Sequence, residues 1–346
     1  MTSALERLFG ESKGNKIERE FLEQMDAYYA APSSGFHDNG IARKFYQQKL
    51  AYLKWSPYPD DGFITFGASG TNQCDRQVVY KYGGVKVEKS PDIPFRGRQR
   101  RTGSAVIDFF QLDLLHMEKR LGKNIKFKMS VKENGEWNFE DAAQVRKVFE
   151  YDGVKLAITA KPDGIFDYEG QQLLFEYKTK ASGLVAMNNK LNFKGAQDDH
   201  LRQVTAESLV FGIREGLIVY ESTEKPSWFS DFENKNVPKT RKTWGEDEPV
   251  KDLRAFYFEI TDEMQQALLA DLAKQAKQVY SKEVPTMQVE MTGKCGFCQF
   301  VNVCKSSLSD EEKQSLFEAE HRYAQSQYAG KYAHKNLKNY LSGVSE

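Results

Sequence analysis

The apolar positions in the first part of the chain recur at the spacing of a helix. Residues 1–62 are mostly polar, but an apolar and aromatic stripe runs through Phe21, Met25 and Tyr28, and a looser one covers residues 45–55. Side chains three and four positions apart share one face of a helix, so this pattern predicts helical material. No motif that carries chemistry lies there. We therefore expect a helical N-terminal region that serves as a structural cap or as a partner-binding surface.

The rest of the chain alternates between short apolar runs and longer helical patterns. The short runs predict strands at residues 125–131, around Trp137, and at 155–166, 173–177, 217–220 and 254–260. The longer patterns predict helices at residues 102–121, 198–211 and 261–280, and partly helical structure in the polar tail from 309. Residues 222–250 carry proline and charge without a period, which is typical of a surface loop or lid.

One pair of the predicted strands brings charged side chains together. Asp163 follows Pro162 near the end of the first apolar run, the chain turns at residues 169–170, and Glu176 and Lys178 lie near the end of the returning strand. Because side chains alternate along a strand, Glu176 and Lys178 share one face. Two converging carboxylates repel each other unless a cation lies between them, and oxygen ligands suit Mg²⁺ or Mn²⁺. The alternative is a solvated hairpin edge on which these charges pair.

Composition limits what could attract such a chain to nucleic acid. Its 346 residues include 49 Lys and Arg against 49 Asp and Glu, so any DNA binding must rest on local patches. A hydrophobic share of 40% indicates a folded core. We find no apolar run long enough for a membrane span and no signal peptide at the N-terminus, so we expect a cytoplasmic protein with no membrane partner, bacterial or phage-encoded in a host cytoplasm.

A basic patch precedes the helix predicted at residues 102–121. It consists of Arg96, Arg98, Arg100 and Arg101. Guanidinium groups this close could bind a phosphate backbone, and a solvated loop explains them equally well. On the helix itself, His116 shares a face with Leu112, which suits a structural histidine; as a metal ligand it would have to reach Asp163.

The four cysteines give a second candidate site. Cys295, Cys298 and Cys304 form a C-x2-C-x5-C cluster, and Cys74 is the one other cysteine. In a reducing compartment such a cluster indicates a metal site more than a disulfide set. Four thiolates can hold a 4Fe-4S cluster or a tetrahedral Zn²⁺ ion. Zinc ribbons more often show two C-x2-C pairs, and a lone cysteine such as Cys74 is usually a small buried apolar residue.

The string from Pro162-Asp163 to Glu176-Tyr177-Lys178 resembles the motif of the PD-(D/E)xK nuclease superfamily. The resemblance implies that Asp163 and Glu176 are metal ligands, that Tyr177 offers its backbone carbonyl to the metal, and that Lys178 is the catalytic lysine. It also implies an α/β fold with a restriction-endonuclease-like core, in which helices flank a central mixed sheet.

Together with the cysteines, the chain resembles RecB-like nucleases that carry an iron-sulfur cluster, such as the AddB nuclease domain and the CRISPR-associated iron-sulfur exonucleases. In that group one cysteine precedes the nuclease core and three follow it, which matches the order here. The resemblance covers roughly Cys74 to Cys304, and we expect a nuclease core with the cysteine cluster at 63–305. A helical region at 1–62 and a polar tail at 306–346 lie outside the resemblance. Ile107 stands where the family often has a metal-binding histidine. In the family's Q-x-x-x-Y helix motif, Gln203 is retained but Glu207 replaces the tyrosine.

These patterns lead us to expect a Mg²⁺- or Mn²⁺-dependent deoxyribonuclease, an exonuclease acting on DNA ends or single strands in recombination or repair. Gln203 would orient Lys178 or touch the strand. Candidate partners besides DNA are a helicase, an annealing protein or a recombination protein. Two alternatives remain: a nuclease-like adaptor that binds DNA ends without cleaving them, and a zinc-stapled protein without a nuclease function.

Overall fold

The computed structural model describes most of the chain, in two compact units. The described residues are 11–30, 37–53, 59–87, 93–226, 250–325, 330–342 and 344. The first unit comprises Met1–Thr71, Ile93–Phe149 and Ala157–Leu268. The second comprises Asn72–Asp92, Glu150–Leu156 and Leu269–Glu346. Most of residues 222–250, for which the sequence predicts a loop or lid, lie outside the described part.

A five-stranded mixed sheet forms the centre of the first unit. Its strands, in spatial order, are β2 (Phe127–Met129), β5 (Gly164–Tyr168), β6 (Gln171–Lys180), β7 (Glu215–Ser222) and β8 (Leu253–Glu259). β6 and β7 are parallel, and the other neighbours are antiparallel. A parallel pair needs a crossover connection, which here contains two helices, α6 (Leu184–Lys194) and α7 (Asp198–Phe211).

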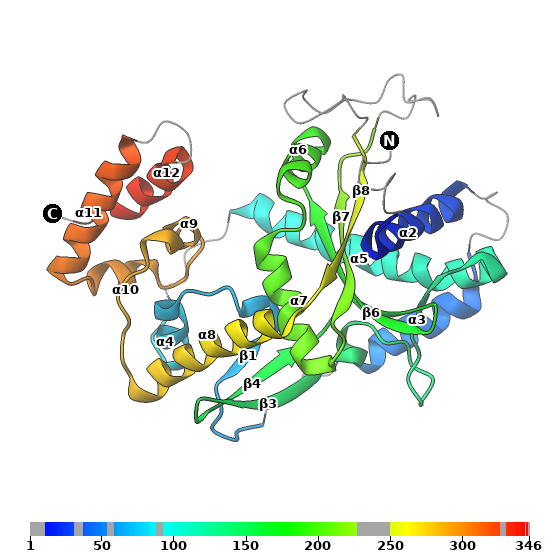
Figure 1. Cartoon of the computed structure of the whole chain (residues 1–346), viewed down its shortest axis with the longest axis horizontal. Helices are drawn as coiled ribbons and strands as arrows, with labels where there is room; N and C mark the ends of the chain where they lie inside the picture. Colours follow the sequence, from blue (N-terminus) through cyan, green and yellow to red (C-terminus); the bar gives the residue numbers. More distant parts are fainter. Residues whose placement is uncertain are drawn as a thin grey trace. The chain divides into compact units, whose positions relative to one another are not determined.

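The alternation of side chains along β6 divides the core into two apolar clusters, one on each face of the sheet. Phe175 and Tyr177 pack with Phe110 on the face covered by α2 (Lys13–Ala30), α3 (Asn39–Ala51) and α5 (Pro94–Leu121). Leu174 packs with Val204 on the face covered by α6 and α7. Figure 1 shows α2 and α7 on opposite sides of β7 and β8. The expected α/β class, with helices flanking a mixed sheet and a helical N-terminal region, is confirmed.

The hairpin between β5 and β6 forms as predicted, with a two-residue turn at Glu169 and Gly170. Both residues have positive φ angles, 49° and 84°. This geometry matches the twist of the flanking strands, and the glycine adopts it without steric cost. The turn fixes the register that places Gly164 opposite Phe175.

The single strand predicted at residues 155–166 is wrong, because the chain changes sheets there. β4 (Val154–Ala160) pairs with β1 (Thr65–Gly67) and β3 (Val145–Tyr151) in a separate three-stranded sheet. β5 begins only at Gly164. Pro162 lies between the two strands, and it cannot donate a hydrogen bond to a strand ladder.

The arginines expected ahead of the helix at residues 102–121 belong to that helix. α5 begins at Pro94, and it therefore contains Arg96, Arg98, Arg100 and Arg101. A proline fits the first helical turn because the N–H that it lacks would have no intrahelical partner, and arginine is a good helix former. The basic patch thus lies along the first turns of this helix.

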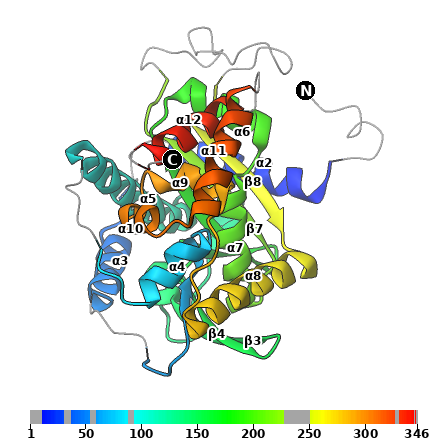
Figure 2. The same cartoon turned by 90° about the vertical axis from the view of Figure 1, so that its left-hand side faces the viewer.

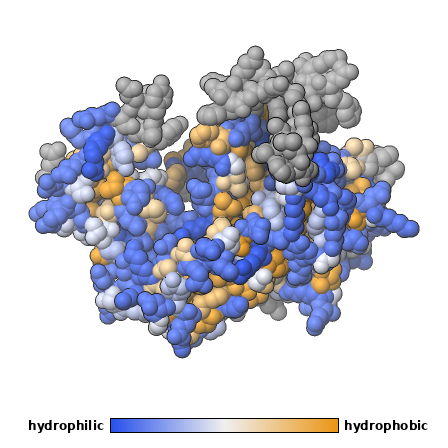
Figure 3. Space-filling model, viewed as in Figure 1, coloured by the Kyte–Doolittle hydropathy of each residue, from blue (hydrophilic) through white to orange (hydrophobic). Residues whose placement is uncertain are grey.

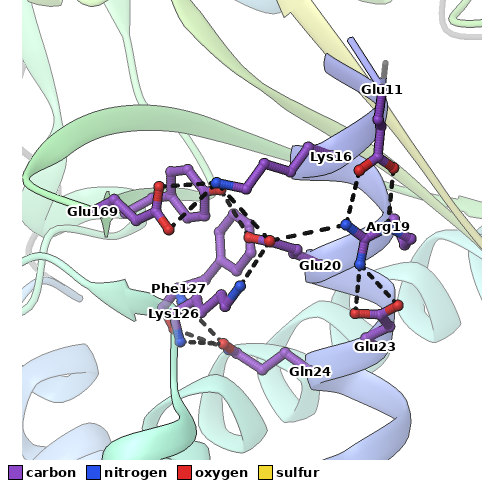
Figure 4. A network of polar contacts seen from close by, with 10 residues as sticks. Glu11, Lys16, Arg19, Glu20, Glu23, Gln24, Lys126, Phe127 and Glu169 are labelled. Atoms are coloured by element: carbon purple, nitrogen blue, oxygen red, sulfur yellow. Dashed lines mark hydrogen bonds and ion pairs between the residues drawn. The ribbon is translucent and has the colours of Figure 1, made fainter. Parts of the chain in front are cut away.

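Helix α2 is joined to the edge strand β2 by a network of polar contacts (Figure 4). The amide of Gln24 accepts from the N–H of Phe127 at 2.9 Å and donates to its carbonyl at 3.0 Å, which satisfies backbone groups at the edge of the sheet. Glu20 contacts Lys126 at 2.7 Å and accepts from Tyr168 at 2.8 Å. Burial acts to raise the pKa of Glu20, but these two contacts outweigh it and lower the pKa.

The second unit is mainly helical. Its helices are α4 (Asp75–Tyr82), the C-terminal part of α8 (Asp262–Ser281), α9 (Thr292–Cys295), α10 (Val301–Ser306), α11 (Asp310–Ala324) and α12 (Gly330–Leu341). A capping box starts α11, since Ser309 and Glu312 bond each other's backbone N–H. α11 and α12 lie side by side (Figure 2). The expected helical tail is therefore present in the described residues.

Hydrophilic side chains predominate on the face shown in Figure 3. Among the described residues, no helix has the length and apolar character needed to cross a bilayer.

A glycine on β7 gives a test of the sheet's close packing. A Cβ at Gly216 would lie 2.1 Å from the carbonyl oxygen of Leu174 on β6, so Gly216→Ala must push the two strands apart. We expect a loss of about 1–3 kcal/mol in the free energy of unfolding, measured by urea denaturation. Gly67→Ala is the control, because nothing lies within 4 Å of its Cβ position. Equal urea midpoints for the two variants would contradict the packing described.

Candidate active site

Asp163 is fixed at the bend where the chain enters β5. Its Oδ2 accepts a hydrogen bond of 2.7 Å from the backbone N–H of Tyr177 on β6. The pairing of β5 with β6 begins one residue later, at Gly164, so the carboxylate takes the place of a strand partner for Tyr177. The carbonyl of Asp163 accepts from Nε2 of Gln111, on α5, at 2.9 Å. Both the side chain and the backbone of Asp163 are thus held.

Glu176 and Lys178 lie on the face of β6 that is opposite Tyr177, as the alternation predicts. Their side chains form an ion pair. Glu176 is 2% exposed, and its Oε2 has no hydrogen-bond partner among the described residues. A buried carboxylate oxygen without a partner carries a large desolvation cost, which a bound cation would offset.

Helix α7 adds two polar side chains from the facing layer. Oε1 of Gln203 accepts from Nζ of Lys178 at 2.9 Å, and Nε2 of Gln203 donates to Glu207 at 3.0 Å. Glu207 is fully buried, and its Oε2 also has no partner within the described part of the chain. The result is a continuous chain of contacts from Glu176 through Lys178 and Gln203 to Glu207.

The carboxyl groups of this cluster outnumber its one ammonium group. Burial, followed by the charge of Glu176, raises the pKa of Asp163 and of Glu207. Burial also raises the pKa of Glu176. Burial acts to lower the pKa of Lys178, but the charge of Glu176 and its hydrogen bond outweigh this and raise it. Two buried carboxyl groups, Glu176 and Glu207, and the half-buried Asp163 therefore lie near one ammonium, an environment that favours a proton or an added cation.

The donor set suits a hard divalent ion at the Asp163–Glu176 pair. Carboxylate oxygens are the usual ligands of Mg²⁺, which is commonly bound by one or two carboxylates together with water and substrate phosphate. The unpartnered Oε2 of Glu176 is the feature that fits such an ion. Within the described residues, however, no group of three or more His, Cys, Asp or Glu side chains is arranged so that it could hold a metal ion.

His116 has a structural contact at another place on α5. Its Nε2 accepts from the backbone N–H of Asp38 at 3.1 Å, and Asp38 caps the N-terminus of α3. One turn after Ile107, α5 presents Gln111 to the backbone of Asp163. No pattern in the sequence distinguished Gln111. The four-residue spacing of Gln203 and Glu207 was visible, but nothing in it indicated that Glu207 would be buried.

The basic patch is accessible along most of its length. Arg98, Arg100 and Arg101 are exposed on α5, and Arg96 is half-buried. Its role in binding DNA stays a prediction.

All four cysteines line one cavity of the second unit, with a volume of about 20 Å³. None of them forms a disulfide. Burial, followed by the charges of Cys74 and Cys304, raises the pKa of the Cys295 thiol to about 12. Cys74 is the N-cap of α4 and not a residue of its first turn, because its sulfur accepts the N–H of Gln77. A set of four unpaired thiols at one cavity is a suitable donor set for a cluster or a zinc ion.

Comparisons with known proteins give limited information. No protein-family model matches the chain, and no curated protein matches its sequence. Among solved structures, SSO0001 is 16% identical, covers 78% of this chain and 95% of its own, and has a TM-score of 0.38. LHK-Exo in complex with dAMP is 11% identical, covers 64% and 90%, and has a TM-score of 0.35. The alkaline exonuclease LHK-Exo from Laribacter hongkongensis is 10% identical, covers 64% and 91%, and has a TM-score of 0.33.

The buried Glu207 predicts how stability depends on pH. Since its pKa is raised in the folded state, the native protein keeps a proton that the unfolded chain releases above about pH 4.5, so stability falls as the pH rises from there. In Glu207→Gln this loss is absent, and we expect the decline in unfolding free energy between pH 5 and 8 to shrink by up to about 1.4 kcal/mol per pH unit.

The measurement is urea denaturation in metal-free buffer at both pH values, with the exposed Glu259→Gln as the control. Parallel pH profiles for the parent and Glu207→Gln would show that Glu207 does not retain its proton.

Proposed function

We propose that the chain is a metal-dependent nuclease that hydrolyses DNA phosphodiester bonds, acting as an exonuclease on ends or single strands in recombination or repair. The observation that carries the proposal is the meeting of Asp163 and Glu176 where β5 and β6 stop pairing, with Lys178 bonded to Glu176 and an oxygen of Glu176 left without a partner among the described residues. The resemblance of the sequence motif to PD-(D/E)xK nucleases agrees with this arrangement.

Each residue of the cluster has a role that follows from its contacts. Asp163, Glu176 and the backbone carbonyl of Tyr177 would hold a Mg²⁺ or Mn²⁺ ion. When bound, the ion supplies an acidified water and Lewis-acid polarisation of a phosphate oxygen. The ammonium of Lys178 stabilises the negative charge that grows on the phosphate. Gln203 keeps that ammonium in place through its 2.9 Å contact, and Glu207 fixes which end of the Gln203 amide faces Lys178.

For the four cysteines we propose a 4Fe-4S cluster, with Zn²⁺ as the alternative. A single Zn²⁺ needs four sulfurs at about 2.3 Å from one point. In a cluster each thiolate binds a different iron, so the sulfurs can lie farther apart. The role of the cluster would be structural, since it would join α4 to the segment between α8 and α11 within the second unit.

Removal of Lys178 or Asp163 tests the nuclease. We expect Lys178→Ala and Asp163→Ala to digest end-labelled DNA at least about 10²–10³-fold more slowly than the parent with Mg²⁺ or Mn²⁺, because each loses stabilisation of the developing charge or a metal ligand. Asp167→Asn is the control, since Asp167 is an exposed carboxylate on the same strand β5. Digestion by either alanine variant at the rate of the parent would refute the assignment. DNA binding by the parent without cleavage under any metal would favour the adaptor alternative.

Anaerobic purification tests the cysteine site. We expect a brown protein with about four irons per chain, whose colour and folded stability are both lost in Cys298→Ser and Cys304→Ser, since each removes one of the four cluster ligands. A colourless protein that contains one zinc would support the alternative, and a parent without either metal would exclude both.

A further inference from the structure

A cluster of cationic and amide donors lies beyond Lys178 on the same face of the sheet. We call it the cationic cluster; it consists of Lys180 on β6, Lys190 on α6, and Gln197 and His200 at the start of α7. Lys180 is two residues after Lys178, so both side chains point to the face covered by α6 and α7. Tyr220 on β7 lies beneath the cluster. Nζ of Lys180 lies 5.0 Å from the centre of its ring.

Tyr220 determines which groups of the cluster remain available as donors. Its hydroxyl accepts the backbone N–H of Gln197 at 3.0 Å and lies 2.7 Å from Nδ1 of His200. The hydroxyl can donate its own proton to Nδ1, and in that tautomer the neutral imidazole carries its proton on Nε2. Oε1 of Gln197 accepts a hydrogen bond of 2.6 Å from Nζ of Lys190. Nε2 of Gln197 has no hydrogen-bond partner among the described residues. The cluster therefore presents mainly donors.

The positive charges of the cluster repel one another. Burial, followed by the charges of Lys190 and Lys178, lowers the pKa of Lys180 to about 8. Burial and the charges of Lys178, Lys180 and Lys190 lower the pKa of His200 to about 3. Among the described residues, Asp199 is the acidic group whose charge opposes these shifts; its Oδ1 lies 3.9 Å from Nε2 of His200, and its side chain is 54% exposed. Two lysines and the donors of neutral His200 thus lie together without a matching buried carboxylate, an arrangement that an anion would stabilise.

We propose that the cationic cluster binds a backbone phosphate of the nucleic-acid strand next to the one that is cleaved at Asp163, Glu176 and Lys178. The proposal rests on the proposed nuclease function. A phosphodiester suits the cluster because it offers acceptor oxygens and a single negative charge, and lysine is a common partner of phosphate. The exposed Lys190 and the half-buried Lys180 would hold the charge, and His200 and Gln197 would contribute hydrogen bonds.

DNA binding by the parent and three variants tests this site. The measurement is the Kd of a labelled single-stranded oligonucleotide, from fluorescence anisotropy in EDTA, at several salt concentrations and at pH 7 and 9. We expect Lys180→Gln to raise the Kd several-fold at pH 7 and to reduce the slope of log Kd against log salt by about 0.7, the value for one phosphate contact on a single strand. Lys194→Gln, an exposed lysine at the end of α6, is the matched control and should bind as the parent does.

The pH dependence separates a phosphate contact from a structural role. In the parent, Lys180 loses its proton near pH 8, so the Kd should rise several-fold between pH 7 and 9. Lys180→Arg keeps its charge and should retain at pH 9 the affinity that it has at pH 7. Oligonucleotides with and without a terminal phosphate distinguish the two sources of the anion: an effect of Lys180→Gln on both assigns an internal phosphate, and an effect only with the terminal phosphate overturns that assignment.

Each result has a clear consequence. Equal Kd values, salt slopes and pH profiles for Lys180→Gln and the parent would overturn the site even if the parent cleaves DNA. A weaker Lys180→Gln complex together with a parent that cleaves no DNA would support the phosphate site and reject the nuclease. A parent that binds no DNA under any of these conditions would reject both.

Discussion

The hydrogen bond from the N–H of Tyr177 to the carboxylate of Asp163 holds the candidate site together. It forms where β5 ends its pairing with β6, so it joins two strands at the point where their backbone ladder stops. Because Asp163 is also held through its carbonyl by Gln111, the acid has little freedom to move away from Glu176. The proline before it lies between β4 and β5, where the chain leaves one sheet and enters the next, and a proline cannot donate to a strand ladder.

The position of the site also depends on a difference between the two faces of the sheet, which carry different kinds of side chain. The face under α2, α3 and α5 is filled with aromatic side chains, including Tyr177 and Phe110. The opposite face carries Leu174 in an apolar cluster but then Glu176, Lys178 and Lys180 farther along the strand. On this face, β6 therefore changes from apolar to charged side chains over a few residues. The polar groups that α7 supplies, Gln203 and Glu207, satisfy some of that polarity and leave an oxygen of Glu176 unpartnered.

The second unit contains the other candidate site, in which the possible ligands are sulfur atoms. Cys74 is far in the sequence from Cys295, Cys298 and Cys304, and yet all four line one cavity and remain reduced. Cys295 and Cys304 are buried while Cys74 and Cys298 are half-buried, and burial, followed by the charges of Cys74 and Cys304, raises the pKa of Cys295. Tyr340 of α12 adds a contact of 3.3 Å with the sulfur of Cys304, so the C-terminal helices take part in enclosing the cavity.

The sequence by itself determined the features that depend on neighbours along the chain. The alternation of residues 173–178 placed Glu176 and Lys178 on one face, the Glu-Gly pair predicted the tight turn, and the spacing in residues 198–211 predicted α7. Only the tertiary structure decided where that helix lies, and so that Glu207 is buried beside Gln203. It also decided that Gln111 reaches Asp163 while His116 accepts the backbone N–H of Asp38, and that Lys180, Lys190 and His200 meet. Periodicity records which side chains share a face of one element. It carries no information on which element will cover that face, because long-range packing sets that.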